Sequence, residues 1–158
     1  MSEKKVKCFH LVNLDKRLGR GDGRKEKVGQ TLRIPSGTYP EVCRYGLHGC
    51  RKVTDAIRNH RGLVLCRVEI GGDVIEGTGT NRFGRPRSTS KVAGRNRKVL
   101  AMVNVKGVYS QMLRWAKAKG FTTEGRLVDR VRAVIKQWPY ASEKKIRSLL
   151  RERSSFKF

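Results

Sequence analysis

The segment from Cys43 to Glu76 constrains the fold most strongly, because all of its local signals agree. Near its start, Gly46 and Gly49 bracket Leu47 and His48, which predicts a tight backbone path at this point. The residues that follow carry the pattern of a short helix and then of two strands. The whole unit is therefore expected to run as turn, helix, strand, strand.

The helix of this unit is predicted over residues 52–60, whose apolar positions recur at i, i+3 and i+4. Short oxygen-bearing side chains at residues 54–55 can satisfy unpaired amides near its start. Residues 63–70 are rich in β-branched and apolar side chains and predict a strand whose first part is buried on both faces. Glycines at residues 71–72 make a turn or bulge, after which residues 73–76 continue or pair with that strand.

The remaining chain predicts two more strands and three helices. Residues 4–13 and 28–34 are expected to be strands, and residues 77–90 an exposed loop because they have almost no apolar content. Residues 92–105 are ambiguous, with a first half that fits a basic helix and a second half that fits a strand. Apolar stripes at helical spacing predict three helices over residues 108–119, 124–137 and 142–153.

These elements predict an α+β fold with a small, mostly antiparallel sheet and one crossing helix. We expect the core domain to span residues 1–106, since that part holds the strands. Residues 107–158 are expected to form a basic helical extension packed on or beside this core.

Part of the sequence resembles a known family. The pattern Cys-x-x-Gly-Leu-His-Gly-Cys, then a helix with Asp-Ala, then Leu-Cys-Arg-Val-Glu-x-x-Gly-Asp-Val-Ile-Glu resembles an uncharacterised domain common in bacteriophage proteins. Residues 28–31 and 92–101 resemble an upstream and a closing segment of that domain, so the resemblance covers residues 6–102. It implies a phage setting and assigns no activity.

The order of the predicted strands and helix is also similar to that of the small rifampicin-modifying type of ADP-ribosyltransferase, in which an early strand carries a His and a helix leads into a strand that ends near an acid. This similarity implies NAD as a cofactor and His10 as a nicotinamide-site residue, with Asp73 or Glu76 as the acid. The residue after His10 is not the glycine of that pattern. His48 is a further catalytic candidate because it lies between glycines inside the motif. It is equally expected to hold the turn by a hydrogen bond to the backbone.

The charge of the chain is its strongest functional signal. The 158 residues carry 37 basic and 13 acidic side chains, a formal charge of +24, which favours a polyanionic partner. Between Glu76 and Glu124 no acid occurs over 47 residues, whereas a solvated face usually mixes both signs. We therefore expect contacts with nucleic acid phosphates, RNA being favoured over DNA. The expected contact residues are Arg82, Arg85, Arg87, Lys91, Arg95, Arg97, Lys98, Lys117 and Lys119.

The sequence thus predicts a non-catalytic, nucleic-acid-binding accessory protein of phage type, which could be associated with the ribosome and needs no cofactor. The alternatives are an ADP-ribosyltransferase-like enzyme that acts on a nucleic acid or a nucleic-acid-bound target, and a structural component of a virion or ribonucleoprotein. No apolar run long enough to span a membrane occurs, and the start lacks the apolar core of a signal peptide, so we expect a cytoplasmic location in the bacterial host, or the virion.

The cysteines are expected to be reduced thiols in such a compartment. Cys43, His48 and Cys50 have the spacing Cys-x4-His-x-Cys, which offers three zinc ligands and no clear fourth. We therefore expect no metal site.

Overall fold

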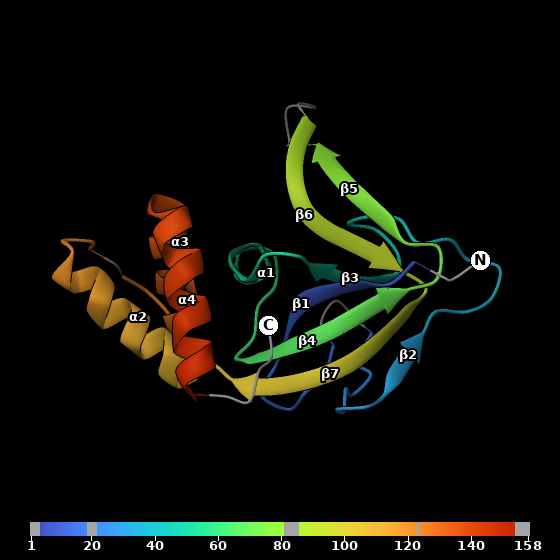
Figure 1. Ribbon diagram of the computed structural model, residues 1–158, viewed down its shortest axis with the longest axis horizontal. Coiled ribbons are helices and arrows are strands. Elements are labelled where there is room, and N and C mark those ends of the chain that lie inside the picture. Colours follow the sequence, from blue (N-terminus) through green and yellow to red (C-terminus); the bar gives the residue numbers. More distant parts are fainter. Residues whose placement is uncertain (1–3, 19–21, 81–85, 123, 154–158) are drawn as a thin grey trace.

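The computed structural model describes residues 4–18, 22–80, 86–122 and 124–153, and these form one antiparallel sheet with helices against it (Figure 1). The predicted α+β class is confirmed. The described strands are β1 (Val6–Val12), β2 (Thr31–Arg33), β3 (Leu47–Cys50), β4 (Val64–Gly71), β5 (Ile75–Thr80), β6 (Pro86–Gly94) and β7 (Asn96–Asn104). They lie in the order β2-β7-β4-β1-β3-β6-β5, and every neighbouring pair is antiparallel.

Strand β1 lies at the centre of this sheet and is buried along almost its whole length. It pairs with β4 over seven residues, with His10 opposite Cys66, and with β3 through Phe9 and Cys50. Because side chains alternate along a strand, Phe9 faces one side of the sheet and His10 the other. The functional argument below depends on the side that His10 faces.

The helices are α1 (Val53–Asn59), α2 (Lys106–Ala118), α3 (Leu127–Gln137) and α4 (Pro139–Arg153). They share one apolar cluster with the sheet face that carries Phe9. Each of α2, α3 and α4 contributes fully or almost fully buried side chains to it, for example Met112, Ile135 and Leu150. The predicted helical extension therefore packs on the sheet and completes its core.

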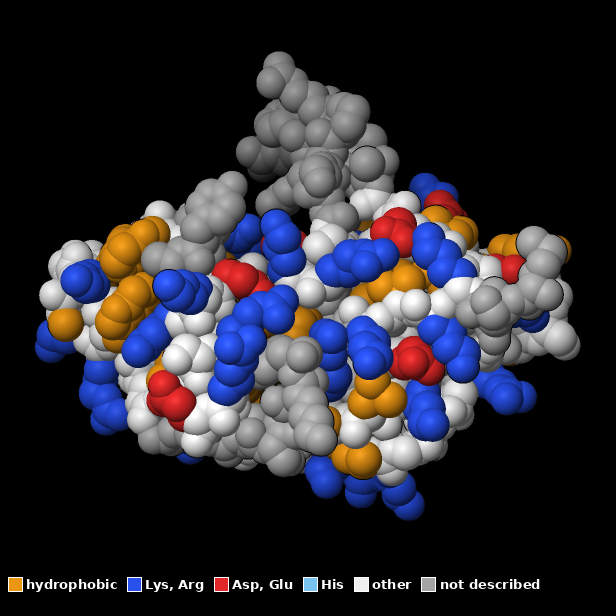
Figure 2. Space-filling view, in the orientation of Figure 1, with side chains coloured by type: hydrophobic (Ala, Val, Ile, Leu, Met, Phe, Trp, Pro, Cys, Tyr) orange, Lys and Arg blue, Asp and Glu red, His pale blue; other side chains and the backbone are white. Residues whose placement is uncertain are grey.

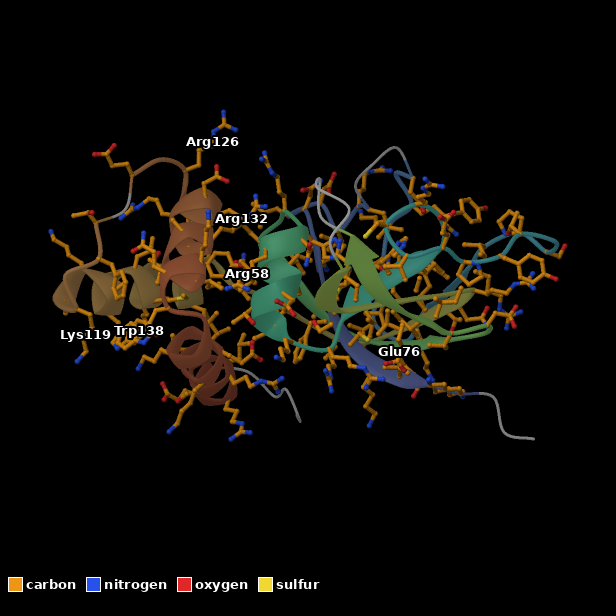
Figure 3. All side chains as sticks on the ribbon, turned by 90° about the horizontal axis from the view of Figure 1, so that it is seen from above. Arg58, Glu76, Lys119, Arg126, Arg132 and Trp138 are labelled. Atoms are coloured by element: carbon orange, nitrogen blue, oxygen red, sulfur yellow. The ribbon has the colours of Figure 1, made fainter. Side chains whose placement is uncertain are left out.

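Hydrogen bonds at both ends of α1 fix it between α3 and α4. The Arg58 guanidinium donates to the carbonyl of Ile135 on α3, at 2.9 Å, and Arg132 donates back to the carbonyl of Arg58, at 2.6 Å. Figure 3 shows Arg58 and Arg132 next to each other where α1 and α3 meet. At the other end of α1, the Glu143 carboxylate of α4 accepts hydrogen bonds from the amides of residues 53 and 54. The expectation that residues 54–55 cap this helix is wrong, because a distant carboxylate takes that role.

The opposite sheet face is covered by the long connection between β1 and β3, which includes β2. Leu18 and Leu32 of this connection pack with Val12, Cys66 and Val68 of the sheet in a second apolar cluster. This connection and the end of β1 enclose the cavity described in the next subsection.

The expectation of a loop over residues 77–90 is wrong for residues 77–80 and 86–90, and residues 81–85 lie outside the described residues. Strands β5 and β6 form a hairpin there, with Gly79 opposite Arg87, and it stands away from the rest of the sheet (Figure 1). Backbone hydrogen bonds hold such a hairpin without an apolar face, so hydropathy does not reveal it. The helical alternative for the first half of residues 92–105 is also wrong, since β6 and β7 occupy this segment.

The predicted turn over Gly46 to Gly49 is shorter than expected, because β3 already begins at Leu47. Gly46 has a φ of +110°, a conformation that side chains rarely adopt. Gly49 lies within the strand, where a Cβ would approach the Cβ of Cys8 to 2.6 Å. The two glycines of the motif therefore serve a turn and a close packing contact.

Candidate functional site

A cavity of about 1120 Å³ opens where β1 ends. His10 reaches it from β1, His48 from β3 and His60 from the end of α1, so all three histidines of the chain line one cavity. The connection between β1 and β3 supplies much of the remaining wall, and Arg132 of α3 closes part of it. Three elements that are distant in sequence thus bring titratable rings together.

His10 forms the most buried polar part of the lining. Its side chain is 8% exposed, and its ring meets that of His60 edge-on with 4.6 Å between the centroids. Burial, followed by the charge of Arg97 and the nearby rings of His60 and His48, holds the pKa of His10 well below 6.5. The ring is therefore neutral at physiological pH. Within the described part of the chain, its Nδ1 atom has no hydrogen-bond partner.

Arg97 lies beneath this site rather than on an open surface. It is 2% exposed, forms an ion pair with the fully buried Glu26, and donates from a terminal nitrogen to the carbonyl of His48 at 2.9 Å. The sequence predicted Arg97 as a phosphate contact. The structure gives its guanidinium a buried partner instead, because the connection carrying Glu26 folds over β7.

His48 is in contact with the backbone of the preceding turn. Its Nε2 atom lies 3.2 Å from the amide nitrogen of Cys43 and 3.2 Å from the carbonyl oxygen of Glu41. Cys43 itself has a φ of +71°, and its sulfur lies 3.2 Å from Lys91 Nζ at the cavity wall. His48 therefore holds the turn, which is one of the two roles that the sequence suggested for it, the other being catalytic.

The cavity is strongly cationic. Its only acidic lining residue among those described is Asp22, which accepts two hydrogen bonds from Arg24, at 2.6 and 2.8 Å. The side-chain hydrogen bond from Arg24 is also the main reason why the pKa of Asp22 lies below its ordinary value. The basic lining residues are Arg24, Arg33, Arg44, Arg61, Lys91, Arg97 and Arg132.

The two predicted carboxylates do not join this site. Asp73 lies 3.4 Å from Arg95, and Glu76 forms ion pairs of 2.7 Å with both Lys4 and Arg51. Hydrogen bonds from Lys4 and Arg51 hold the pKa of Glu76 below its ordinary value, so it is ionised at neutral pH. Figure 3 shows Glu76 on the sheet, apart from the helices. The structure thus separates His10 and His48 from both proposed acids.

The predicted phosphate contacts are spread over the molecule. Lys91 and Arg97 line the cavity, Lys98 is exposed on β7, and Arg95 is held by Asp73 and the carbonyl of Pro35. Lys117 near the end of α2 and Lys119 just after it are exposed, and Figure 3 labels Lys119 there. Arg82 and Arg85 lie outside the described residues, and only the backbone of Arg87 is described. Figure 2 shows basic side chains distributed over the whole visible face.

Sequence reasoning missed most of the cationic cavity wall. The sequence signal for phosphate contacts was a stretch without acidic residues, whereas residues 22–61 contain both acidic and basic side chains. In the structure the acids of that stretch are bound by arginines, as Asp22 is by Arg24, Glu26 by Arg97 and Glu41 by Arg44. The missed cations are Arg24, Arg33, Arg44, Arg61 and Arg132.

Neither a metal-binding cluster nor a membrane-spanning helix is found among the residues that the structure describes. No group of three or more His, Cys, Asp or Glu side chains is placed to hold a metal ion there. None of the described helices is long and apolar enough to cross a membrane. All four cysteines are free thiols, with Cys43 exposed and the other three buried.

Comparison with known protein families, with curated proteins and with solved structures finds no match for this chain. The functional argument therefore depends on the site itself.

Proposed function

We propose that the protein binds nucleic acid by its phosphates, with the cavity at the end of β1 as the principal contact site. The setting is that of a phage-type accessory protein in the bacterial cytoplasm. The observation that carries the proposal is the charge of the cavity lining, which holds seven basic side chains and, among the described residues, the single carboxylate of Asp22. Four of the seven form ion pairs with Asp22 or with acids outside the lining, so the excess positive charge comes from Arg33, Arg61 and Lys91.

The chemistry of these side chains supports a phosphate-bearing ligand. Guanidinium groups bind phosphate oxygens in a bidentate manner, and six of the seven cations are arginines. Arg33, Arg44 and Arg61 are exposed, so they are accessible to a polymer at the cavity mouth. Each phosphate that they neutralise releases condensed counterions, which favours binding at low salt.

The test measures how binding depends on salt. A cavity variant with Arg33, Arg44 and Arg61 replaced by Ala is compared with the wild type on a fluorescein-labelled single-stranded RNA dodecamer. Because each lost phosphate contact lowers the logarithmic salt slope by about 0.7, we expect a slope flatter by about 2 units. Fluorescence anisotropy between about 50 and 200 mM salt provides the binding constants.

The matched control removes the same charge elsewhere. Arg114, Lys117 and Lys119 are exposed on α2 or just after it, and none of them lines the cavity. Their triple Ala variant should keep the wild-type slope. A flattened slope in this α2 variant together with an unchanged slope in the cavity variant would move the binding face to the helices and overturn the proposal for the cavity.

A second candidate function is NAD-dependent ADP-ribosyl transfer to a nucleic-acid-bound target. It is favoured by one observation, the buried neutral ring of His10 in a cavity large enough for a nucleotide. Asp73 and Glu76 lie outside that cavity, so the acid of such a reaction is not among the residues first proposed. A raised melting temperature with NAD and release of nicotinamide would support this candidate, and the absence of both would end it.

A further inference from the structure

We propose that the cavity accepts a single unpaired nucleotide, with the base in the cavity and its phosphates at the basic mouth. This inference rests on the proposed nucleic-acid binding and narrows it to single strands, or to a nucleotide turned out of a helix. Three observations carry it: the mixed lining of the cavity, the free nitrogen of His10, and the position of Tyr45.

The lining combines apolar and cationic groups in the way that a nucleotide requires. Leu18, Ile34 and Leu47 provide apolar wall, while the arginines line the same space. A phosphate without a base would need only the arginines. A binding site for a whole nucleotide needs an apolar surface for the base as well, because apolar walls with a few placed polar groups are typical of small-ligand sites.

His10 supplies a polar group for the base edge. Its side chain is more than nine-tenths buried, it lines the cavity, and Nδ1 has no hydrogen-bond partner in the part of the chain described here. Nδ1 is itself covered, so the ring turns when it presents this nitrogen to a base. A buried polar atom without a partner costs free energy, and a ligand that provides one recovers it. A neutral imidazole nitrogen donates or accepts according to its tautomer, which suits the uncharged edge of a base.

Tyr45 supplies an aromatic face at the mouth. It lines the cavity and is 41% exposed, and it follows Arg44, which also lines the cavity. Alternation of aromatic and basic side chains is typical of proteins that bind single strands, where bases stack on rings and cations bind the backbone.

The size of the cavity excludes a base pair within a helix. Its volume corresponds to a space roughly 10 Å across, whereas a duplex is thicker than this, because its major and minor grooves alone are about 8.5 and 7.5 Å deep. Only a base that has left the helical stack can enter such a space, as in proteins that turn a nucleotide out of a duplex.

The experiment separates the base from the phosphates. The probes are a fluorescein-labelled DNA dodecamer made only of abasic tetrahydrofuran nucleotides, and the same strand with one central adenine or one central thymine. All carry the same number of phosphates. Because stacking of one base contributes about 1–3 kcal/mol, we expect one base to tighten binding by about fivefold or more.

Two variants locate the effect. Tyr45→Ala should lose most of the gain from the single base, while Tyr39→Ala should retain it, since Tyr39 is 76% exposed and does not line the cavity. His10→Phe keeps a ring of similar size and removes its nitrogens, and it should lower the gain with at least one of the two bases. If His10→Phe does not fold, Tyr45→Ala against Tyr39→Ala still decides the question.

The possible outcomes distinguish this inference from the proposed function. Equal binding of the abasic and base-containing strands, both weakened by salt, would overturn the nucleotide site and leave phosphate binding intact. A base-dependent gain that Tyr45→Ala does not reduce would place the base elsewhere and overturn the inference too. No binding of any strand at low salt would refute the proposed function itself.

Discussion

Arg97 and Glu26 form an ion pair in which both side chains are buried, with 2% and 0% of their surface exposed. The pair joins β7 to the connection that covers the sheet, and Arg97 also donates to the carbonyl of His48 on β3. It therefore fixes the floor of the cavity. Removing one member of a buried pair leaves the other charge without compensation.

We expect Glu26→Ala to destabilise the protein by about 3–5 kcal/mol, because the Arg97 guanidinium would stay buried without its carboxylate. Urea unfolding followed by circular dichroism measures this loss. The matched control is Glu69→Ala, whose partner Lys5 is 58% exposed, and it should cost less than about 1 kcal/mol. Equal losses in the two variants would contradict the structural role of the pair.

Glu143 links stability to pH through α1. Burial raises the pKa of this carboxyl. Hydrogen bonds from Thr54 and Arg147 together lower it by more than burial raises it, so the pKa lies below 4.5. A carboxyl with a depressed folded pKa contributes stability above its unfolded pKa and loses it as pH falls through the folded value. Glu143→Gln should therefore cost about 1–3 kcal/mol at neutral pH and progressively less below about pH 4.5.

Glu152→Gln is the control for this prediction. Glu152 is exposed on the same helix and accepts a hydrogen bond only from Ser148 among the contacts described. It should change stability by less than about 0.5 kcal/mol. Unfolding in urea at several pH values tests both variants, and a Glu143→Gln deficit that is constant down to acid pH would argue against the linkage.

The four cysteines should differ in reactivity. Burial raises the pKa of Cys8 to about 11 and that of Cys50 to about 12, and it also raises the pKa of Cys66. Cys43 is exposed at the cavity wall. Since the thiolate is the reactive form, Ellman's reagent should titrate one thiol in the native protein and four in urea. Replacing Cys43 by Ser should abolish the native reaction, and more than one native thiol would contradict the burial.

Elements with strong hydrophobic periodicity were predictable from the sequence, and elements held by backbone pairing were not. The segments that form β1, β4 and all four helices were identified with small errors at their ends. The hairpin of β5 and β6 was missed, since Thr78, Gly79 and their partners carry no apolar pattern. The cap of α1 could not be foreseen either, because Glu143 lies 89 residues from Thr54.

The residues of the cavity were also predictable only in part. His10 was a candidate from the similarity to the ADP-ribosyltransferase type and His48 from the motif, and the structure brings both to one cavity. His60 and the arginines of the wall were not candidates, because only the fold brings residues as distant as Arg24 and Arg132 together. Charge counted along the sequence does not show which acids are already bound by arginines, and this decides where the free cations are.

The last prediction concerns the dependence of the sheet on the terminal helices. Deleting residues 121–158 removes α3 and α4, whose buried apolar side chains pack on Phe9 and Ile57. Burial of one such side chain contributes about 1.5–3 kcal/mol, so losing six removes about 9–18 kcal/mol, which is comparable with a typical total stability of about 5–15 kcal/mol. We therefore expect no cooperative unfolding in the truncated chain, although the sequence alone predicted a core domain over residues 1–106. The six are Val131, Val134, Ile135, Ile146, Leu149 and Leu150.

Point variants test the same packing without a deletion. Leu150 is fully buried on α4, and Leu150→Ala should cost about 2–5 kcal/mol because a cavity remains in the core. Leu14→Ala is the matched control, since Leu14 is 58% exposed and its replacement should change stability by less than about 0.5 kcal/mol. A truncated chain that unfolds cooperatively, with Leu150→Ala as mild as Leu14→Ala, would show that the sheet is stable without its helices.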